Sequence, residues 1–367
     1  MRIDTRIIKS KQAVEGYITA TPSRNLPIEE QARELFAGIR DALNSHNLRL
    51  LQERIFGTKE ALGVSRKARA EAYGPLDDGL EPSLLLVPGG ITGQIAGVQV
   101  HAVGGGQHPE LLRLGDTPCG RIFRQSDGSY VTLSNISASP QNQPVKQARI
   151  AFEKTESVLK HVNACMLDVS RTWIWLADIL SWYGDFNAVR NEFYTERGLV
   201  TNGKLNRMPA STGIGIGSHS GAACAIDLVA VIEPRKPIEY FNNAGNQKSA
   251  FTYGSAFSRA SKTASPAGTT VFVSGTASID SAGRTIHLND APAQIETTIE
   301  NVRAVLKQTN FHDNHVVQAT AYCKSPEIEK LFLEKWSDLS WPTLTTITDI
   351  CRPKLLFEME LTAACAD

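Results

Sequence analysis

The 367-residue chain repeats one pattern of predicted secondary structure three times. Amphipathic helices are predicted over residues 30–43, 146–159 and 293–306, because apolar residues recur there at helical spacing. In each helix a glutamine stands twelve residues before a leucine that we expect in the core, and these pairs are Gln31 and Leu43, Gln147 and Leu159, and Gln294 and Leu306. We therefore interpret the chain as three copies of one unit, and this limits its fold more than any other feature does.

The segments around these helices follow the same order in every copy. A β-rich stretch ending in small residues precedes each helix, and a strand, a second helix and two closing strands follow it. The second helix is predicted over residues 65–73, 183–197 and 328–339, and it is shortened in the first copy. The predicted order is a β-hairpin, a helix, a strand, a helix and two strands, which corresponds to an α+β fold with half-buried sheets.

The repeat also predicts how the chain divides. We assign residues 1–115 to a first, degenerate unit, residues 128–232 to a second unit and residues 269–367 to a third. The segments 104–127 and 233–268 are richer in Gly, Pro, Asn and Ser than their surroundings, and we interpret them as linkers or inserted loops.

Composition excludes several classes of function. The 38 basic and 38 acidic residues cancel, so no charge excess suggests a nucleic-acid partner or a membrane surface. The N-terminus lacks the apolar stretch of a signal peptide, and no apolar run is long enough to span a bilayer. The six cysteines form no CxxC pair, which argues against a zinc site and against a disulfide framework. We predict a cytoplasmic protein without a cofactor or a metal.

The closing strand of the third copy alternates apolar and acidic side chains. Phe357, Met359 and Leu361 fall on one face of this strand, and Glu358 and Glu360 fall on the other. A polar turn that contains a thiol and a guanidinium group precedes the strand. An exposed polar strand face would give the same alternation, so the pattern alone leaves a site and a solvated surface open.

The three copies differ at this strand. When the closing strands are aligned by their terminal alanines, one position holds Gln99, Asp227 and Glu360. The position two residues earlier holds Gly97, Ala225 and Glu358. Only the third copy has a carboxylate at this second position. This is expected after triplication with one surviving active site, although divergence by drift gives the same pattern.

The repeated unit resembles the Rid/YjgF family, also described as endoribonuclease L-PSP-like. The resemblance is carried by residues 357–363, which are similar to the closing strand of that family. Its chains form trimers with ligand clefts between subunits. The resemblance implies three Rid/YjgF-like, chorismate-mutase-like units of sheet and helices in a pseudo-trimeric chain. We expect a monomer with an internal pseudo-threefold axis, and a higher oligomer is left open.

Residues 209–215 read Pro-Ala-Ser-Thr-Gly-Ile-Gly, a Tyr-Gly and a Phe-Ser-Arg-Ala element follow, and residues 351–360 carry Cys-Arg and the two glutamates. Together and in this order, these motifs resemble those of the chorismatases, and this closer resemblance covers about residues 128–366. One departure is the loop 253–257, which lacks the Pro-Arg-x-Pro portion of the family's loop. The resemblance implies an enzyme of the chorismate lyase or hydrolase type that cleaves the enolpyruvyl ether of chorismate, or of a related cyclic carboxylate, and releases pyruvate.

The resemblance also implies roles for individual residues. Protonation of an enol ether needs a carboxyl group that stays protonated near neutral pH, and we assign this role to Glu358, with Glu360 raising its pKa. Cys351 stands where the family varies between alanine and cysteine, and cysteine favours a 3-hydroxybenzoate product. The residues expected to bind the substrate, a small carboxylate, are Arg352, Arg259, Tyr253, Thr212 and Gly213.

Two other functions stay open from the sequence. A Rid-type hydrolase would deaminate reactive enamines or imines, with an arginine on the substrate carboxylate and a water molecule activated by Glu358. A non-catalytic protein that binds small carboxylates would also fit, because the first two copies have lost the acid. For the individual residues, a buried structural role stays open for the Cys351 thiol, and ordinary surface salt bridges stay open for Arg352 and Arg259.

Overall fold

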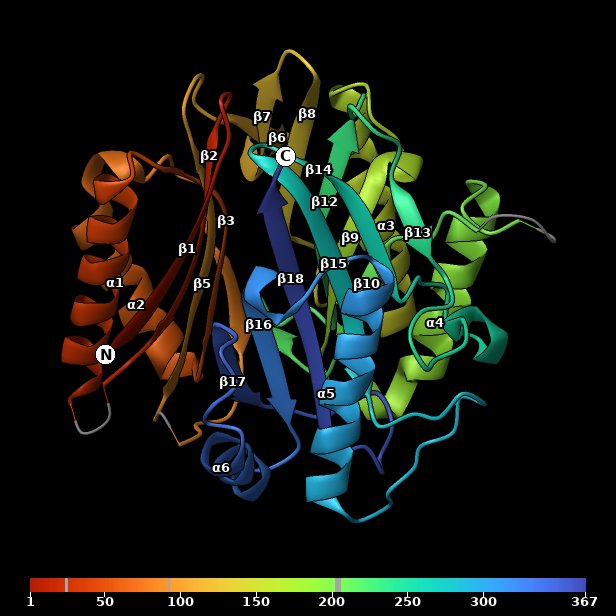
Figure 1. Cartoon of the computed structure of the whole chain (residues 1–367). Coiled ribbons are helices and arrows are strands. Elements are labelled where there is room, and N and C mark those ends of the chain that lie inside the picture. Colours follow the sequence, from red (N-terminus) through yellow and green to blue (C-terminus); the bar gives the residue numbers. More distant parts are fainter. Residues whose placement is uncertain (24–25, 92, 202–205) are drawn as a thin grey trace.

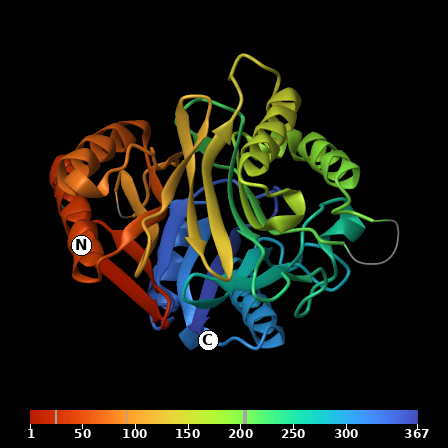
Figure 2. The same cartoon turned by 90° about the horizontal axis from the view of Figure 1, so that it is seen from above.

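The computed structural model describes residues 1–23, 26–91, 93–201 and 206–367. Within these residues the strands form three six-stranded sheets, and six α-helices accompany them. The sheets meet near the middle of the molecule and the helices lie on the outside (Figures 1 and 2). The fold class is α+β, as predicted. We refer to each sheet with its two helices as a unit.

The first unit begins at the N-terminus. Its sheet has the order β1-β2-β5-β3-β4, with β11 of the second unit added at the β4 edge. Its core lies between the sheet and the apolar faces of α1 and α2. The elements are β1 (Arg2–Lys9), β2 (Val14–Thr21), α1 (Ile28–Ser45), β3 (Arg49–Gly57), α2 (Lys59–Tyr73), β4 (Ser83–Leu86) and β5 (Ile95–Gly104).

The second unit repeats this arrangement. Its sheet has the order β10-β9-β12-β8-β7-β6, and its core includes the apolar sides of α3 and α4. The elements are β6 (Glu110–Leu114), β7 (Thr117–Gln125), β8 (Gly128–Ser137), α3 (Pro144–His161), β9 (Val169–Leu176), α4 (Ile179–Glu196), β10 (Ala210–Ile214), β11 (Gly217–Ser218) and β12 (Cys224–Ile232).

The third unit ends the chain, with the sheet order β13-β14-β15-β18-β16-β17. Its core lies under α5 and α6 and includes Phe357, Met359 and Leu361 of β18, as the alternation in that strand predicts. The elements are β13 (Glu239–Phe241), β14 (Ala260–Ser265), β15 (Gly268–Ala277), α5 (Ala291–Gln308), β16 (Val316–Cys323), α6 (Pro326–Lys335), β17 (Thr343–Ile347) and β18 (Phe357–Ala366).

Two segments that we interpreted as linkers contain strands. The segment 104–127 holds β6 and β7, and the segment 233–268 holds β13 and β14. β7 and β14 are the first strands of the hairpins that precede α3 and α5, whereas β6 and β13 lie at sheet edges. These strands contain Gly, Ser and Pro, which outer strands tolerate. Their sequences therefore show little alternation of apolar and polar residues. Where one unit ends and the next begins along the chain stays a prediction.

The prediction of the second helices was partly wrong. Helix α2 begins at Lys59 rather than near residue 65, because the Thr58 side chain accepts a hydrogen bond from the Ala61 amide and caps the helix. With 15 residues it is longer than α6, which has 10. The shortened second helix therefore belongs to the third unit and not to the first.

The repeated glutamines connect a helix to the start of a closing strand. The Gln147 Oε1 atom accepts a hydrogen bond from the Ala223 amide at 2.7 Å, and Gln294 Oε1 accepts one from the Leu356 amide at 2.8 Å. In the first unit, Gln31 Oε1 is buried without a partner in the described residues. The glutamine of the repeat is thus a structural residue that fixes where β12 and β18 begin.

The three sheets enclose a shared core. One apolar cluster contains residues from all three units, among them Phe56, Trp173, Trp175, Phe272 and Tyr322. The strand that pairs in parallel at the edge of each sheet packs on the next unit: β4 on β8, β10 on β15 and β17 on β2. This cyclic order is a pseudo-threefold arrangement inside one chain.

Polar pairs repeat at the three interfaces around this core. Register places Arg54, Trp173 and Thr320 at one position of the repeat. Their partners on the next unit are again equivalent to one another. Arg54 binds Asp227, the Trp173 indole donates to Glu360, and Thr320 contacts Gln99. The pattern confirms the alignment of Gln99, Asp227 and Glu360 made from sequence.

Candidate active site

A cavity of about 170 Å³ lies between the second and third units. We call it the main cavity. Six of its lining residues matter most here, and they are Tyr253, Arg259, Cys351, Arg352, Glu358 and Gly213. The structure therefore brings together six of the seven residues that the sequence singled out, from β10, β18 and two loops.

Glu358 supplies the carboxyl group of the main cavity. It lies in β18 and only 5% of it is exposed. Burial is the largest influence on its pKa and the charge of Glu360 is the next, and together they raise the pKa of Glu358 to about 8. A β-carbon added at Gly275 would lie 2.2 Å from Glu358 Oε1, so the carboxyl group occupies space that only glycine leaves there. At neutral pH Glu358 is protonated and can donate a proton.

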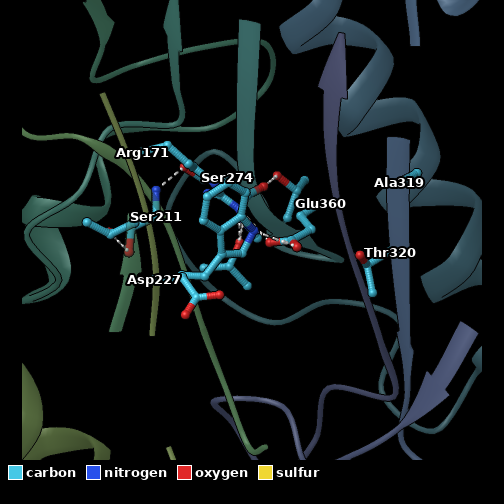
Figure 3. A network of polar contacts seen from close by, with 12 residues as sticks. Arg171, Ser211, Asp227, Ser274, Ala319, Thr320 and Glu360 are labelled. Carbon is cyan, nitrogen blue, oxygen red and sulfur yellow. Dashed lines mark hydrogen bonds and ion pairs between the residues drawn. The ribbon is translucent and has the colours of Figure 1, made fainter. Parts of the chain in front are cut away.

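Glu360 is fixed behind Glu358 in the shared core. It forms an ion pair with Arg171, and both residues are labelled in Figure 3. It also accepts hydrogen bonds from the Trp173 indole and the Tyr322 hydroxyl, each at 2.9 Å. Three donors therefore hold the Glu360 carboxylate in place. Glu358, whose pKa is raised, is the member of the pair that can donate a proton.

Two guanidinium groups face this carboxyl group. Arg259 donates from Nε to the Lys248 carbonyl at 2.9 Å and from Nη2 to the Tyr253 hydroxyl. Arg352 donates to the Gly283 carbonyl at 2.9 Å. Among the described residues neither arginine forms an ion pair with a carboxylate, which leaves both charges available to an anionic ligand.

Cys351 is a thiol rather than a thiolate. Burial, with a smaller contribution from the charge of Glu358, raises the pKa of Cys351 to about 12. The thiolate is the nucleophilic form of cysteine, so at neutral pH this residue does not act as a nucleophile. Its position in the cavity lining leaves it a role in shaping the ligand environment.

Thr212 is not brought into the main cavity. The flanking residues Ser211 and Gly213 line it instead, because neighbouring residues of β10 point to opposite faces. The Thr212 hydroxyl accepts hydrogen bonds from Arg171 at 2.7 Å and from the Gly275 amide at 3.0 Å. Thr212 thus joins the second unit to the bulge of β15 from the core side.

The sequence reasoning missed two groups of lining residues. Tyr183 and Asn187 come from helix α4, and Gly275, Ala277 and Ile279 come from the end of β15 and the turn after it. The helical spacing of four between Tyr183 and Asn187 was visible, but nothing in the sequence shows which face of α4 meets the third unit. Burial raises the pKa of Tyr183 to about 12, so its hydroxyl is neutral.

A counterpart hollow lies between the first and second units. Its lining includes Glu81, Thr117, Cys119 and Asn135. Strand register makes Cys119 equivalent to Arg259 and Asn135 equivalent to Gly275, since β8 and β15 carry a bulge at the same place. Ala225, which corresponds to Glu358, is fully buried. The hollow therefore repeats the position of the main cavity without its acid and without its arginine.

Among residues 1–23, 26–91, 93–201 and 206–367, no three His, Cys, Asp or Glu side chains converge as metal ligands would. None of the helices within these same residues is both long and apolar enough to cross a membrane.

Comparison with known proteins agrees with this geometry. Residues 248–365 match the model of the Endoribonuclease L-PSP family, and no curated protein matches the chain. A crystal structure of a chorismatase is similar over 99% of this chain and 100% of its own, with a TM-score of 0.63 and 18% identity. The expected chorismatase-like fold is thereby confirmed.

Single-unit proteins also match a part of the chain. A putative endoribonuclease from Thermotoga maritima is 20% identical and covers 35% of this chain and 99% of its own, with a TM-score of 0.28. A YjgF-family protein from Neisseria meningitidis is 16% identical over 35% of this chain and 96% of its own, also with a TM-score of 0.28.

Proposed function

We propose that this chain is an enzyme that cleaves the enolpyruvyl ether of chorismate, or of a related cyclic carboxylate, and releases pyruvate. One observation carries the proposal: a carboxyl group whose pKa is raised to about 8 lies in a cavity with two guanidinium groups that have no carboxylate partner in the described chain. A general acid works best when its pKa lies near the operating pH. The likeness of the fold to a chorismatase supports the choice of substrate.

In the proposed reaction the arginines hold the substrate and Glu358 acts on it. Arg259 and Arg352 bind carboxylate groups, for which the planar guanidinium offers paired donors. Glu358 donates its proton to the methylene carbon of the enol ether, and positive charge then develops on the pyruvyl carbon. The Glu358 carboxylate that remains stabilises this oxocarbenium centre through its charge. Neutral Cys351 lies beside the reacting groups and favours a 3-hydroxybenzoate outcome over a dihydrodiol.

The direct test mixes the purified protein with chorismate. Pyruvate is followed by coupled reduction with lactate dehydrogenase, and the ring product is identified by chromatography against 3-hydroxybenzoate and the dihydrodiol. We expect pyruvate and 3-hydroxybenzoate in equal amounts. Binding of chorismate without pyruvate release would instead support a carboxylate-binding protein without turnover.

Hydrolysis of enamines or imines is the second candidate function. The match of residues 248–365 to the Endoribonuclease L-PSP family favours it, because that segment holds Arg259, Cys351, Arg352 and Glu358. An arginine would bind the substrate carboxylate and Glu358 would assist the attacking water molecule. A chain that left chorismate intact but released ammonia from a freshly generated 2-imino acid would have this activity.

A further inference from the structure

One buried arginine of the second unit has no acidic partner among the described residues. Arg190 lies in helix α4 and is fully buried among aromatic residues of the unit's core. Its Nη2 atom donates to Asn187 Oδ1 at 2.5 Å, and its Nε atom has no hydrogen-bond partner within the residues that the structure describes. In the described chain it forms no ion pair, whereas a guanidinium group stays charged in proteins. A buried charge without a counter-charge is costly, which indicates that something outside the folded chain balances it.

Arg190 begins a row of cationic and aromatic groups that continues into the lining of the main cavity. Its guanidinium carbon lies 5.4 Å from the centre of the Phe257 ring, and that of Arg259 lies 5.5 Å from the same ring. Tyr253 likewise stands between Arg259, at 5.7 Å, and Arg352, at 5.2 Å. Three guanidinium groups thus alternate with two aromatic rings, and we call this row the arginine ladder (Arg190, Phe257, Arg259, Tyr253 and Arg352).

Asn187 connects the far end of the arginine ladder to the cavity. Its Oδ1 atom accepts from Arg190, and its Nδ2 atom donates to the Tyr183 carbonyl at 2.9 Å. These two contacts fix which way the amide points, and they leave the second N–H of Nδ2 for a ligand. Asn187 lines the main cavity together with Arg259 and Arg352, so the charge of Arg190 lies one residue behind that lining.

The charges of the cavity do not balance without a ligand. The arginine ladder contributes three positive charges, while Glu358 is neutral below about pH 8 and Glu360 is paired with Arg171. A ligand with one carboxylate can neutralise only one end of the row. An aromatic ring lies near each neighbouring pair of cations, and the positive charge is spread along the row, so two separate anionic groups fit better than one.

We propose that Arg190, acting through Asn187, strengthens the preference of the main cavity for a ligand with two anionic groups over a ligand with one. The inference deepens the proposed function and rests on it for the identity of the binding site. It makes Arg190 a positioning and specificity residue, since its own guanidinium lies behind the cavity wall.

The experiment measures binding of two unreactive probes by calorimetry. Isophthalate carries two carboxylates on a benzene ring and benzoate carries one. We expect the native chain to bind isophthalate more tightly. Arg190→Met should lower the ratio of the two affinities by about tenfold, the effect of one unit charge several ångströms away at intermediate dielectric. The matched control is Arg197→Met, which removes an arginine that stacks on Phe193 near the end of the same helix but is paired with Glu156.

A second variant keeps the test decisive if Arg190→Met folds poorly. Asn187→Asp places a carboxylate against Arg190 and supplies the missing counter-charge. We expect a higher Tm together with the same loss of dianion preference. An unchanged affinity ratio in both variants, or a native chain that binds both probes equally, would overturn the inference.

The outcome is separable from that of the proposed function, because neither probe reacts. A chain that releases no pyruvate from chorismate yet shows an Arg190-dependent preference for isophthalate would remove the proposed reaction and keep the dianion site. Pyruvate release with no Arg190-dependent preference would keep the proposed reaction and remove the dianion site.

Discussion

The main cavity and the counterpart hollow occupy equivalent interfaces but differ in the number and the pairing of their buried carboxyl groups. In the hollow's interface Asp227 is fully buried, paired with Arg54 at 2.8 Å, and it accepts from the Ser83 hydroxyl and the Asn135 amide, each at 2.7 Å. At the main cavity, Glu360 has the same paired position, and a second carboxyl group, Glu358, lies beside it and forms no ion pair with any residue that the structure describes. The single buried carboxylate of Asp227 has a structural role. At the main cavity a second carboxyl group lies beside Glu360, and the pKa of this second group, Glu358, is raised.

Among the variants that test this comparison, Glu358→Gln should have the largest effect, a loss of turnover. Glu358→Gln keeps the size and hydrogen bonding of the side chain but removes the proton donor. Turnover of chorismate should fall by about 10²–10⁴-fold, the usual contribution of general acid catalysis, while isophthalate affinity stays nearly unchanged. The control is Glu81→Gln in the counterpart hollow, where we expect no change in turnover. Full activity in Glu358→Gln would end the assignment of the acid.

Removal of Asp227 should damage stability instead of activity. In Asp227→Ala the guanidinium of Arg54 is left buried without a counter-charge, so we expect a loss of about 3–5 kcal/mol in the free energy of unfolding, measured by urea titration. The double variant Arg54→Met, Asp227→Leu removes both charges and should recover most of the loss. If Asp227→Ala were as stable as the native chain, the pair would not be the structural counterpart of the Glu360 site.

The raised pKa of Glu358 predicts how stability changes with pH. Its pKa is about 8 in the folded chain and 4.5 as a model value, so between these values the folded state binds more protons than the unfolded state. Stability from this group is therefore present at low pH and lost as pH rises through that window, by at most about 1.4 kcal/mol per pH unit. Unfolding of the native chain and of Glu358→Gln, compared from pH 5 to 8, should show a growing difference in favour of the variant. A constant difference would mean that the pKa of Glu358 is not raised.

The smallest effect is expected at Cys351. Cys351→Ala keeps the acid and both arginines, so turnover should change by less than about tenfold. The product should shift from 3-hydroxybenzoate towards the dihydrodiol, which chromatography of the ring product measures. Cys119→Ala, at the position equivalent to Arg259 in the counterpart hollow, serves as the control and should leave the product unchanged. An unaltered product in Cys351→Ala would leave that thiol without a chemical role.

Sequence predicted those parts of the molecule that depend on local pattern. The helical spacing, the repeat and the alternation of β18 gave the three main helices, the closing strands and the equivalence of Asp227 and Glu360. It failed at β6, β7, β13 and β14, whose small residues carry little alternation.

The site itself divides in the same way. Glu358, Arg352 and Cys351 were found because they are close in sequence, and Arg259 because it belongs to a motif. Tyr183, Asn187 and Arg190 lie on α4, and only tertiary packing decides that this face of the helix meets the third unit. The prediction for Thr212 was wrong because its side chain points to the core, whereas the neighbouring residues of β10 line the cavity. A motif does not show which face of a strand each residue occupies.

The tandem arrangement of the three interfaces has a consequence for how such a protein can change over generations. In an assembly of three identical chains, each codon is expressed at three symmetric places, so a substitution that suits one cleft is imposed on the others. Here positions 97, 225 and 358 are separate codons, and so are positions 54, 173 and 320. Selection can therefore tighten one interface with an ion pair, fill another around Gly97 with the Leu344 side chain, and leave the third hollow and reactive. Mutational tolerance should accordingly differ from interface to interface within a single gene.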